Sequence, residues 1–301
     1  MVHSKNFPQL KPLPRFSVSM KRCRAFCLVI LVPCLLLGCT VKVSYRFLDW
    51  IVAWSVDDYV SWDQAQQQLF DRRLEKLLAW HQADQLPRYA QLLQQLRQDM
   101  AQPVSRETLQ LRLEQAGELY QQLLLKAEPD ALILLSSLSE QQVLAMEENL
   151  AKATAKLEKK YLQASAEQRV ERRVESAEDL TSSLLGRLDV EQEQLIQDWA
   201  EQVTGTDLWI ENRKQWATLF IATLANRTAV PELDFATELH RLLVEPQTLW
   251  TTEYQQASEK NVNLALDLVL ALQVTLTERQ RQHLYDEIDQ WVADLQDLSK
   301  R

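Results

Sequence analysis

The chain has 301 residues, of which 46% are hydrophobic and 25% are charged, so it is long enough to bury a substantial core. It contains only 4 glycines and 9 prolines, which argues against turn-rich β-sandwiches, collagen-like repeats and glycine-rich phosphate loops. The formal net charge of −9 argues against a nucleic-acid-binding protein, because such proteins normally carry a basic excess. A mostly helical protein is expected.

The N-terminal segment has the pattern of a targeting signal. A basic cluster at residues 21–24 precedes an apolar segment at residues 25–37. This segment has about 13 residues, too few to cross a hydrocarbon core that needs roughly 20. Residues 1–19 contain three prolines and no apolar period, so translation is expected to begin at Met20.

The apolar segment ends in Leu36-Leu37-Gly38-Cys39, which resembles the lipobox of bacterial lipoproteins. The resemblance implies that a diacylglycerol is attached to the Cys39 thiol, that the chain is then cleaved between Gly38 and Cys39, and that an N-acyl chain such as palmitate is added to the new N-terminus. The alternatives are an ordinary secretory signal and a short buried apolar segment. Because Thr40 rather than Asp follows the cysteine, the resemblance implies the periplasm-facing leaflet of the outer membrane, with the inner membrane as the alternative.

Removal of residues 1–38 changes the charge and the cysteine content of the mature chain. These residues hold six Lys or Arg and no acid, so 27 basic and 42 acidic residues remain, a net charge of −15. All four cysteines lie within the first 39 residues. A disulfide framework, a thiol nucleophile and a cysteine-based zinc site are therefore not expected in the mature domain. Its acidity repels anionic head groups, so the acyl chains must provide the anchoring.

Helical periodicity predicts an all-α multi-helix bundle at residues 44–301, joined to the lipidated cysteine by a short linker at residues 39–43. In the first half, the expected helices are a short one that ends near residues 57–58, a second that begins near 62, a third that starts at Pro87, and one from Ser105 to about Lys126. A longer helix is expected from about 140 and continues through the charged run 167–175. Two more helices are expected to start near 190 and 278, and the latter is the final helix. In the final helix, one seam is expected to face the core, formed by Leu284, Ile288, Trp291, Leu295 and Leu298. Residues 227–231 are a candidate subdomain boundary.

Three of the helix starts share the form Leu-[Ser/Thr/Asp]-x-x-Gln, at residues 138–142, 188–192 and 276–280, and residues 60–64 are a looser copy. This is the pattern of a capping box, in which the hydroxyl or carboxylate accepts the N3 amide hydrogen and the glutamine reaches back to the N-cap amide. We interpret the repeats chiefly as helix starts. They also resemble, weakly, the Leu-Thr-x-x-Gln repeats of periplasmic stress chaperones.

A second resemblance rests on three blocks: Tyr45-Arg46-Phe47-Leu48-Asp49-Trp50, Trp54-Ser55-Val56-Asp57-Asp58-Tyr59, and Trp80-His81 followed by Leu86-Pro87-Arg88-Tyr89. Together with the lipobox, they resemble a family of uncharacterised bacterial helical lipoproteins over roughly residues 36–226. The family is a domain of unknown function, so the resemblance implies a location and a helical fold but no activity.

Several residues near the N-terminus are candidates for interaction. Trp50 and Trp54 lie at i and i+4; we expect them to pack onto the bundle, with insertion into the membrane interface as the alternative. Asp57 and Asp58 are expected to end a helix as solvated acids, with a cation site or a catalytic carboxylate pair as the alternative. The three mature histidines are too scattered for a metal-ligand spacing.

Two further groups are candidates. Trp80 and Arg88 are expected to form a stacked or ion-paired cluster with Tyr89, and His81 is expected to make a structural hydrogen bond, with an ion pair to Asp84 as the alternative. Farther along, arginines at 169, 172 and 173 alternate with glutamates. We expect pairing within that helix, with an anionic partner as the alternative. The arginines for which this pairing is expected are Arg169, Arg172 and Arg173.

No catalytic constellation, metal site or small-molecule cofactor is expected from these patterns. The sequence favours a membrane-anchored periplasmic lipoprotein that acts as a non-catalytic binding or chaperone-like module of the bacterial envelope. Its expected partners are the lipid bilayer, through the acyl anchor, and an unidentified envelope protein. The alternatives are a cell-wall enzyme that uses acids such as Asp57, Asp58 or Asp84, and a structural adaptor of an envelope complex.

Overall fold

The structure, a computed structural model, describes residues 41–300, and every regular element in this range is helical. The all-α prediction is therefore confirmed. The elements are α2 (Val41–Arg46), α3 (Leu48–Asp57), α4 (Gln64–Trp80), the π-helical turn η1 (His81–Gln85), α5 (Leu86–Asp99), α6 (Arg106–Ser136), α7 (Glu140–Tyr161), α8 (Ala166–Leu185), α9 (Val190–Gln202), α10 (Thr206–Ala225), α11 (Glu232–Leu243), the 3-10 turn η2 (Pro246–Leu249), α12 (Thr252–Thr275) and α13 (Glu278–Leu298). The expected leader, Gly38 and Cys39 lie outside the described residues.

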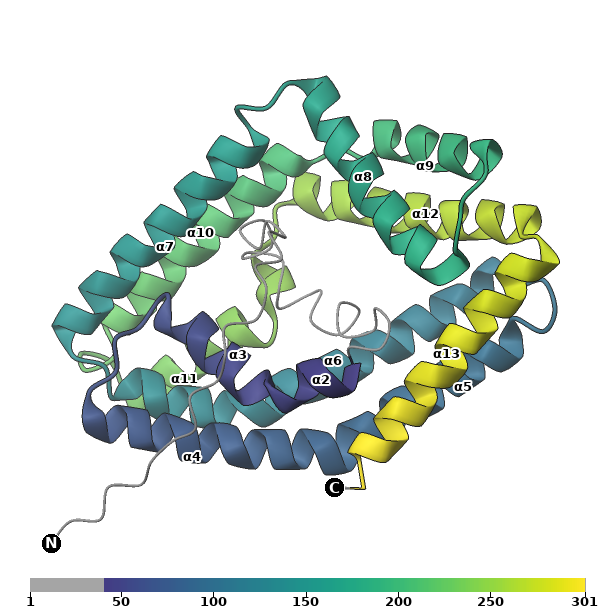
Figure 1. The fold of residues 1–301 in the computed structure, drawn as a ribbon. Helices are drawn as coiled ribbons and strands as arrows, with labels where there is room; N and C mark the ends of the chain where they lie inside the picture. Colours follow the sequence, from purple (N-terminus) through teal and green to yellow (C-terminus); the bar gives the residue numbers. More distant parts are fainter. Residues whose placement is uncertain (1–40, 301) are drawn as a thin grey trace, which may run out of the picture.

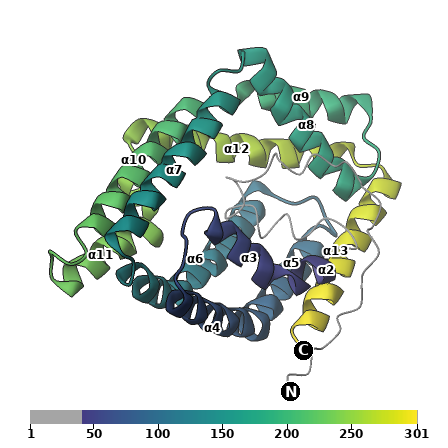
Figure 2. The same ribbon diagram turned by 60° about the vertical axis from the view of Figure 1, so that its left-hand side comes forward.

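The helices follow one another around a closed ring (Figures 1 and 2). Pairs of helices form its sides: α10 lies along α7, α12 along α9, and α13 along α5. The last helix, α13, also contacts α2 and α8, so it joins the beginning of the described chain to its middle and closes the ring. The seam predicted for this helix is buried along its whole length, from Leu284 to Leu298.

The apolar core is divided into three clusters around the ring. The first joins the segment before α4 to α7, α10 and α11, with Leu224 fully buried. The second joins α2, α5, α8 and α13 around Leu86 and Ile288. The third joins α3, α4 and α6 around Phe70 and Leu134. Because Leu224 and Phe235 belong to the same cluster, α10 and α11 pack together across residues 227–231.

Two pairs of capping boxes are joined through their glutamine side chains. At the start of α4 and α7, the Gln66 and Gln142 amides donate to each other's oxygens, with N···O distances of 3.2 and 2.6 Å. Gln66 also donates to the Ser137 carbonyl at 2.9 Å, and Gln142 donates to the Ser61 carbonyl at 2.7 Å. Each glutamine therefore caps its own helix and binds the chain that enters the other one. We call this arrangement the first clasp.

The second clasp repeats the same bonds at the start of α9 and α13. Gln192 and Gln280 donate to each other at 3.1 and 2.8 Å. Gln280 also donates to the Arg187 carbonyl at 3.0 Å, and Gln192 donates to Thr275. The two clasps lie at opposite corners of the ring in Figure 1. Because a buried amide group must be hydrogen-bonded, each clasp fixes two helix starts that are far apart in the sequence.

The looser fourth copy of the motif is shifted by two residues from its expected position. The N-cap of α4 is Asp63 and its N3 glutamine is Gln66, so the helix begins at residue 64 rather than near 62. Another capping box, formed by Ser165 and Gln168, opens α8. The expected continuous helix from residue 140 through the charged run is therefore wrong: α7 ends at Tyr161, and the serine begins a new helix.

Other helix boundaries also differ from expectation. Helix α6 does not end near Lys126 but continues to Ser136, with Pro129, an exposed residue, inside it. The short first helix is interrupted at Phe47, which separates α2 from α3. The helix begins at Val41, within the expected linker at residues 39–43.

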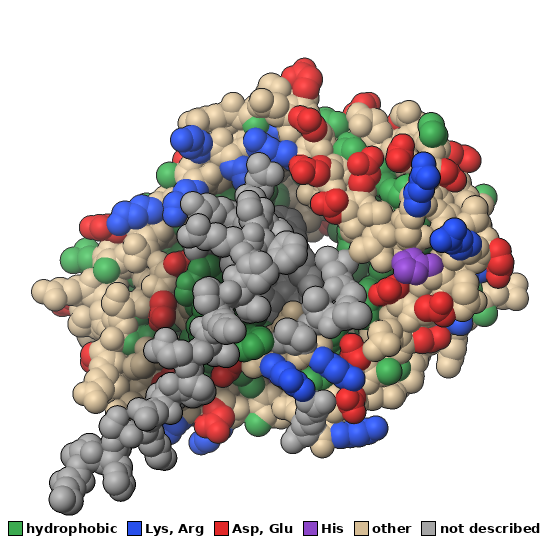
Figure 3. Space-filling model, in the orientation of Figure 1, with side chains coloured by type: hydrophobic (Ala, Val, Ile, Leu, Met, Phe, Trp, Pro, Cys, Tyr) green, Lys and Arg blue, Asp and Glu red, His purple; other side chains and the backbone are tan. Residues whose placement is uncertain are grey.

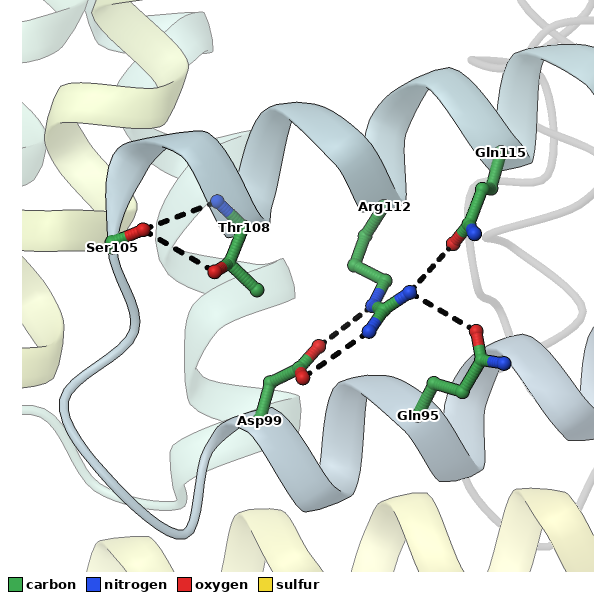
Figure 4. A network of polar contacts seen from close by, with 6 residues as sticks. All are labelled: Gln95, Asp99, Ser105, Thr108, Arg112 and Gln115. Atoms are coloured by element: carbon green, nitrogen blue, oxygen red, sulfur yellow. Dashed lines mark hydrogen bonds and ion pairs between the residues drawn. The ribbon is translucent and has the colours of Figure 1, made fainter.

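The turn between α5 and α6 is held by Arg112 (Figure 4). Its guanidinium binds Asp99 through Nε at 2.6 Å and Nη2 at 3.2 Å, and its Nη1 donates to Gln95 and Gln115. Ser105 caps α6 as expected. A planar guanidinium suits such two-pronged binding, so this network orients α6 relative to α5.

We predict that Gln280→Leu lowers the free energy of unfolding by about 1–3 kcal/mol, because it leaves the buried Gln192 amide without its partner. The double variant Gln192→Leu/Gln280→Leu should lose less than the sum of the two single variants. Urea unfolding of the full chain measures both effects. Gln282→Leu, an exposed position on the same helix, is the control. Strictly additive losses would contradict the clasp.

Candidate functional site

The N-terminal end of the described chain carries an exposed aromatic surface on α3. Phe47, Trp50 and Trp54 are 57%, 61% and 41% exposed, and the two indole rings stack with centroids 6.0 Å apart. The expected packing of these tryptophans onto the bundle is wrong. Helix α3 packs through its opposite face, which includes Leu48 and Val56, so the aromatic residues point away from the core. We call Phe47, Trp50 and Trp54 the aromatic surface.

Helix α2 holds this surface against the ring. The Lys42 Nζ atom lies 3.2 Å from Asp294 Oδ1 and 2.9 Å from Asp297 Oδ2, both on α13. The hydrogen bonds that the Lys42 ammonium donates to Asp297 and Asp294 raise the pKa of Lys42, which stays charged. Val41, the first residue described, is buried in the cluster with α13. The start of the chain is thus attached to the helix that closes the ring.

A second attachment joins α2 to the π-helical turn. The Tyr45 hydroxyl lies 3.0 Å from His81 Nδ1, and Tyr89 packs edge-on against the same imidazole at 5.5 Å. Burial lowers the pKa of His81 to about 4 and raises that of Tyr89 to about 12, so both side chains are neutral near pH 7. His81 therefore makes a structural hydrogen bond, with Tyr45 as its partner rather than Asp84.

The wide turn η1 points polar groups into the protein. Gln82 donates to the Leu298 carbonyl at 2.6 Å, and Gln85 is fully buried. In the described part of the chain, Gln85 Oε1 and the Tyr89 hydroxyl are buried without a hydrogen-bond partner. Because π-helical turns often occur at functional sites, this turn is the most unusual backbone feature near the N-terminus.

Trp80 and Arg88 do not form the expected joint cluster. The Arg88 guanidinium pairs with Asp84, with Nε 3.2 Å from Oδ1, and donates to Gln122 at 2.9 Å. The Trp80 ring instead lies under the Lys126 ammonium, at 5.5 Å. Arg88 is thus ion-paired, but its partner is Asp84 and the pair does not include Trp80. Its hydrogen bond to Gln122 links η1 to α6.

Asp57 and Asp58 are exposed at the C-terminal end of α3, which agrees with their expected role in ending the helix. Across residues 41–300, no group of three or more His, Cys, Asp or Glu side chains is placed to hold a metal ion. In the same range, no helix is long and apolar enough to span a membrane.

The three arginines of α8 bind carbonyl groups of other segments. Arg169 donates to the carbonyls of Tyr161 and Ala164, and Arg172 donates to that of Lys160, at the end of α7. Arg173 donates to Ala200 at the end of α9, at 3.0 Å. The expected pairing with glutamates of the same helix is therefore wrong. Helix C-termini carry unpaired carbonyls and a partial negative charge, which the guanidinium groups satisfy.

An open cleft of about 1060 Å³ lies between the end of α8 and the starts of α9 and α13, beside the second clasp. Its basic residues are Arg187, Arg279 and His283, and they alternate with acids such as Glu178 and Glu193. The cleft therefore has no uniform charge that would select a ligand by its sign.

Sequence reasoning missed Phe47 and the Lys42 attachment. The spacing of Phe47, Trp50 and Trp54 at i, i+3 and i+7 indicates that the three rings share one helix face, but it does not indicate whether that face is exposed. The pairing of Lys42 with Asp294 had no local signal, because the two residues lie at opposite ends of the chain.

We predict that acid destabilises the protein partly through His81. Its pKa is lowered on folding, so between its unfolded value of about 6.5 and its folded value of about 4 the unfolded chain binds the extra proton, and stability falls as the pH falls. His81→Gln keeps a hydrogen-bond acceptor but cannot titrate. From pH 7 to pH 4 it should lose up to about 3 kcal/mol less unfolding free energy than the wild type. Equal losses in urea unfolding would contradict the prediction.

Comparisons with known proteins identify a family but no activity. A search of curated proteins and a search of solved structures found no match. A family model described as a family of unknown function (DUF6279) matches residues 58–255. The match includes the blocks at residues 80–81 and 86–89, begins after the aromatic surface, and extends beyond residue 226. Because it covers more than half of the chain, the protein belongs to this family of unknown function.

Proposed function

We propose that this protein is a lipoprotein of the bacterial envelope, anchored through Cys39 to the periplasmic face of the outer membrane. Its helical ring acts by binding an envelope protein, without catalysis, and the lipid chains on Cys39 are its only covalent group. The exposed aromatic surface on α3 is the single observation that carries the proposal.

The position of the aromatic surface supports membrane contact. Phe47, Trp50 and Trp54 follow the lipobox cysteine by 8, 11 and 15 residues in the sequence. Tryptophan is favoured at the interface between lipid and water, and large apolar side chains exposed together mark a contact surface. The Lys42 and Tyr45 attachments connect this surface firmly to the ring. A lipid anchor at Cys39 would therefore bring the aromatic rings to the head groups.

The arrangement of acidic residues supports binding over cell-wall hydrolysis. A hydrolase of that kind needs two carboxyl groups facing one substrate. Asp84 is instead occupied by Arg88, while Asp57 and Asp58 are exposed at a helix end. A binding role requires an exposed surface, such as the aromatic surface on α3.

The lipid anchor is tested by Cys39→Ser in the native host. The wild-type chain should incorporate labelled palmitate and fractionate with the outer membrane, whereas the variant should lose the label and no longer fractionate with the outer membrane. Unchanged labelling and fractionation would overturn the anchor. Recovery of the wild type in the inner membrane would overturn the outer-membrane assignment alone.

The aromatic surface is tested in a Cys39→Ser chain expressed without residues 1–38, where neither acyl chains nor the apolar leader dominates binding. Flotation with zwitterionic phospholipid vesicles should show weak binding that falls about tenfold or more in Trp50→Ala/Trp54→Ala, because two interfacial indoles are lost. Leu144→Ala/Leu233→Ala removes two other exposed apolar side chains, on α7 and α11, and should bind as well as the parent. Equal binding by all three proteins would contradict membrane contact through α3.

A further inference from the structure

Helix α8 carries a row of acids that its own arginines leave unpaired. Glu167, Glu171, Glu175 and Asp179 recur at every fourth residue, and all four are exposed. Because Arg169, Arg172 and Arg173 bind carbonyls at the ends of α7 and α9, they do not pair with these acids. Within residues 41–300, the carboxylates of Glu171, Glu175 and Asp179 have no ion-pair or hydrogen-bond partner. We call these four residues the acidic row.

Helix α7 carries the opposite charge. Lys152, Lys156 and Lys159 are exposed on one side of its C-terminal half and form the basic row. Glu158, the acid between them, pairs with Lys214 of α10 instead. Lys152 has a weak exposed pair with Glu148 at 3.4 Å, and in the described part of the chain Lys156 and Lys159 have no ion-pair partner. This local excess of lysine stands out in a mature chain with a net charge of −15.

The two rows cannot neutralise each other within one molecule. Helices α7 and α8 diverge from the turn at residues 162–165, and no ion pair joins them among the described residues (Figure 1). On the face of the ring drawn in Figure 3, Lys and Arg side chains gather over α7 and Asp and Glu side chains gather over α8. Like charges four residues apart on a helix repel one another, so each row gains free energy from an oppositely charged partner.

We propose that this face of the α7–α8 corner binds a second copy of the chain. A two-fold rotation places the basic row of one copy against the acidic row of the other, and the reverse, so one surface provides both halves of the interface. The rows match because both repeat at about one helical turn, roughly 6 Å. Leu162, 40% exposed in the turn between the rows, supplies apolar contact at the centre. A partner of a different kind would need only one of the two rows.

Charge reversal tests this pairing in the full chain. Variant A is Lys152→Glu/Lys156→Glu/Lys159→Glu, and variant B is Glu171→Lys/Glu175→Lys/Asp179→Lys. Sedimentation in nonionic detergent should show a wild-type dimer at about 0.01 M salt and a monomer at about 1 M salt, where the Debye length shrinks from about 30 to about 3 Å. Each variant alone should dimerise at least about tenfold more weakly at low salt, because it has rows of one sign only.

An equimolar mixture of A and B should restore the dimer, since every facing pair is again of opposite sign. Restoration also shows that both variants are folded. Arg72→Glu/Lys76→Glu/Lys260→Glu alters the net charge as variant A does, but at exposed positions outside α7 and α8, and it should dimerise like the wild type. A monomeric wild type at low salt, variants that dimerise normally, or a mixture that stays monomeric would each overturn the proposal.

Discussion

A buried side-chain amide costs free energy unless it is hydrogen-bonded, and this constraint joins helix starts at two corners of the ring. A helix start leaves backbone N–H groups without partners, and a glutamine at the third position can satisfy one of them. Here the remaining hydrogen-bonding capacity of Gln66 and Gln192 is used by a glutamine of a distant helix. The same glutamines therefore cap their own helices and join helix starts that are distant in the sequence. In a ring whose apolar core is divided into three clusters, these bonds fix two corners.

The first helices of the described residues connect the aromatic surface to the rest of the protein. Helix α2 is attached through Lys42 to α13 and through Tyr45 to η1, and those two elements belong to the segment where the ring closes. The aromatic surface is therefore attached to the helices that close the ring. The polar groups buried in η1 make this junction sensitive to protonation, because a charged imidazole would lose its solvation there.

The arginines of α8 do not pair with the acids of the same helix. Guanidinium groups that neutralise helix C-termini are unavailable to neighbouring glutamates, so Arg169, Arg172 and Arg173 stabilise the corner of the ring while leaving an acidic row on its surface. The acidic row thus lies on the helix that follows the lysine row in the chain. Such an arrangement favours association with a surface of the same design.

The sequence by itself determined the helical class, the capping boxes at residues 139, 189 and 277, the buried seam of the last helix and the end of α3, because each depends on residues within one or two helical turns. Only the tertiary structure decided which capping boxes meet, that Trp50 and Trp54 face outward, and that the arginines of α8 bind other helices. These outcomes depend on which side of a helix finds a partner distant in the chain. Periodicity shows that a helix has two faces, but packing alone decides which of them is covered.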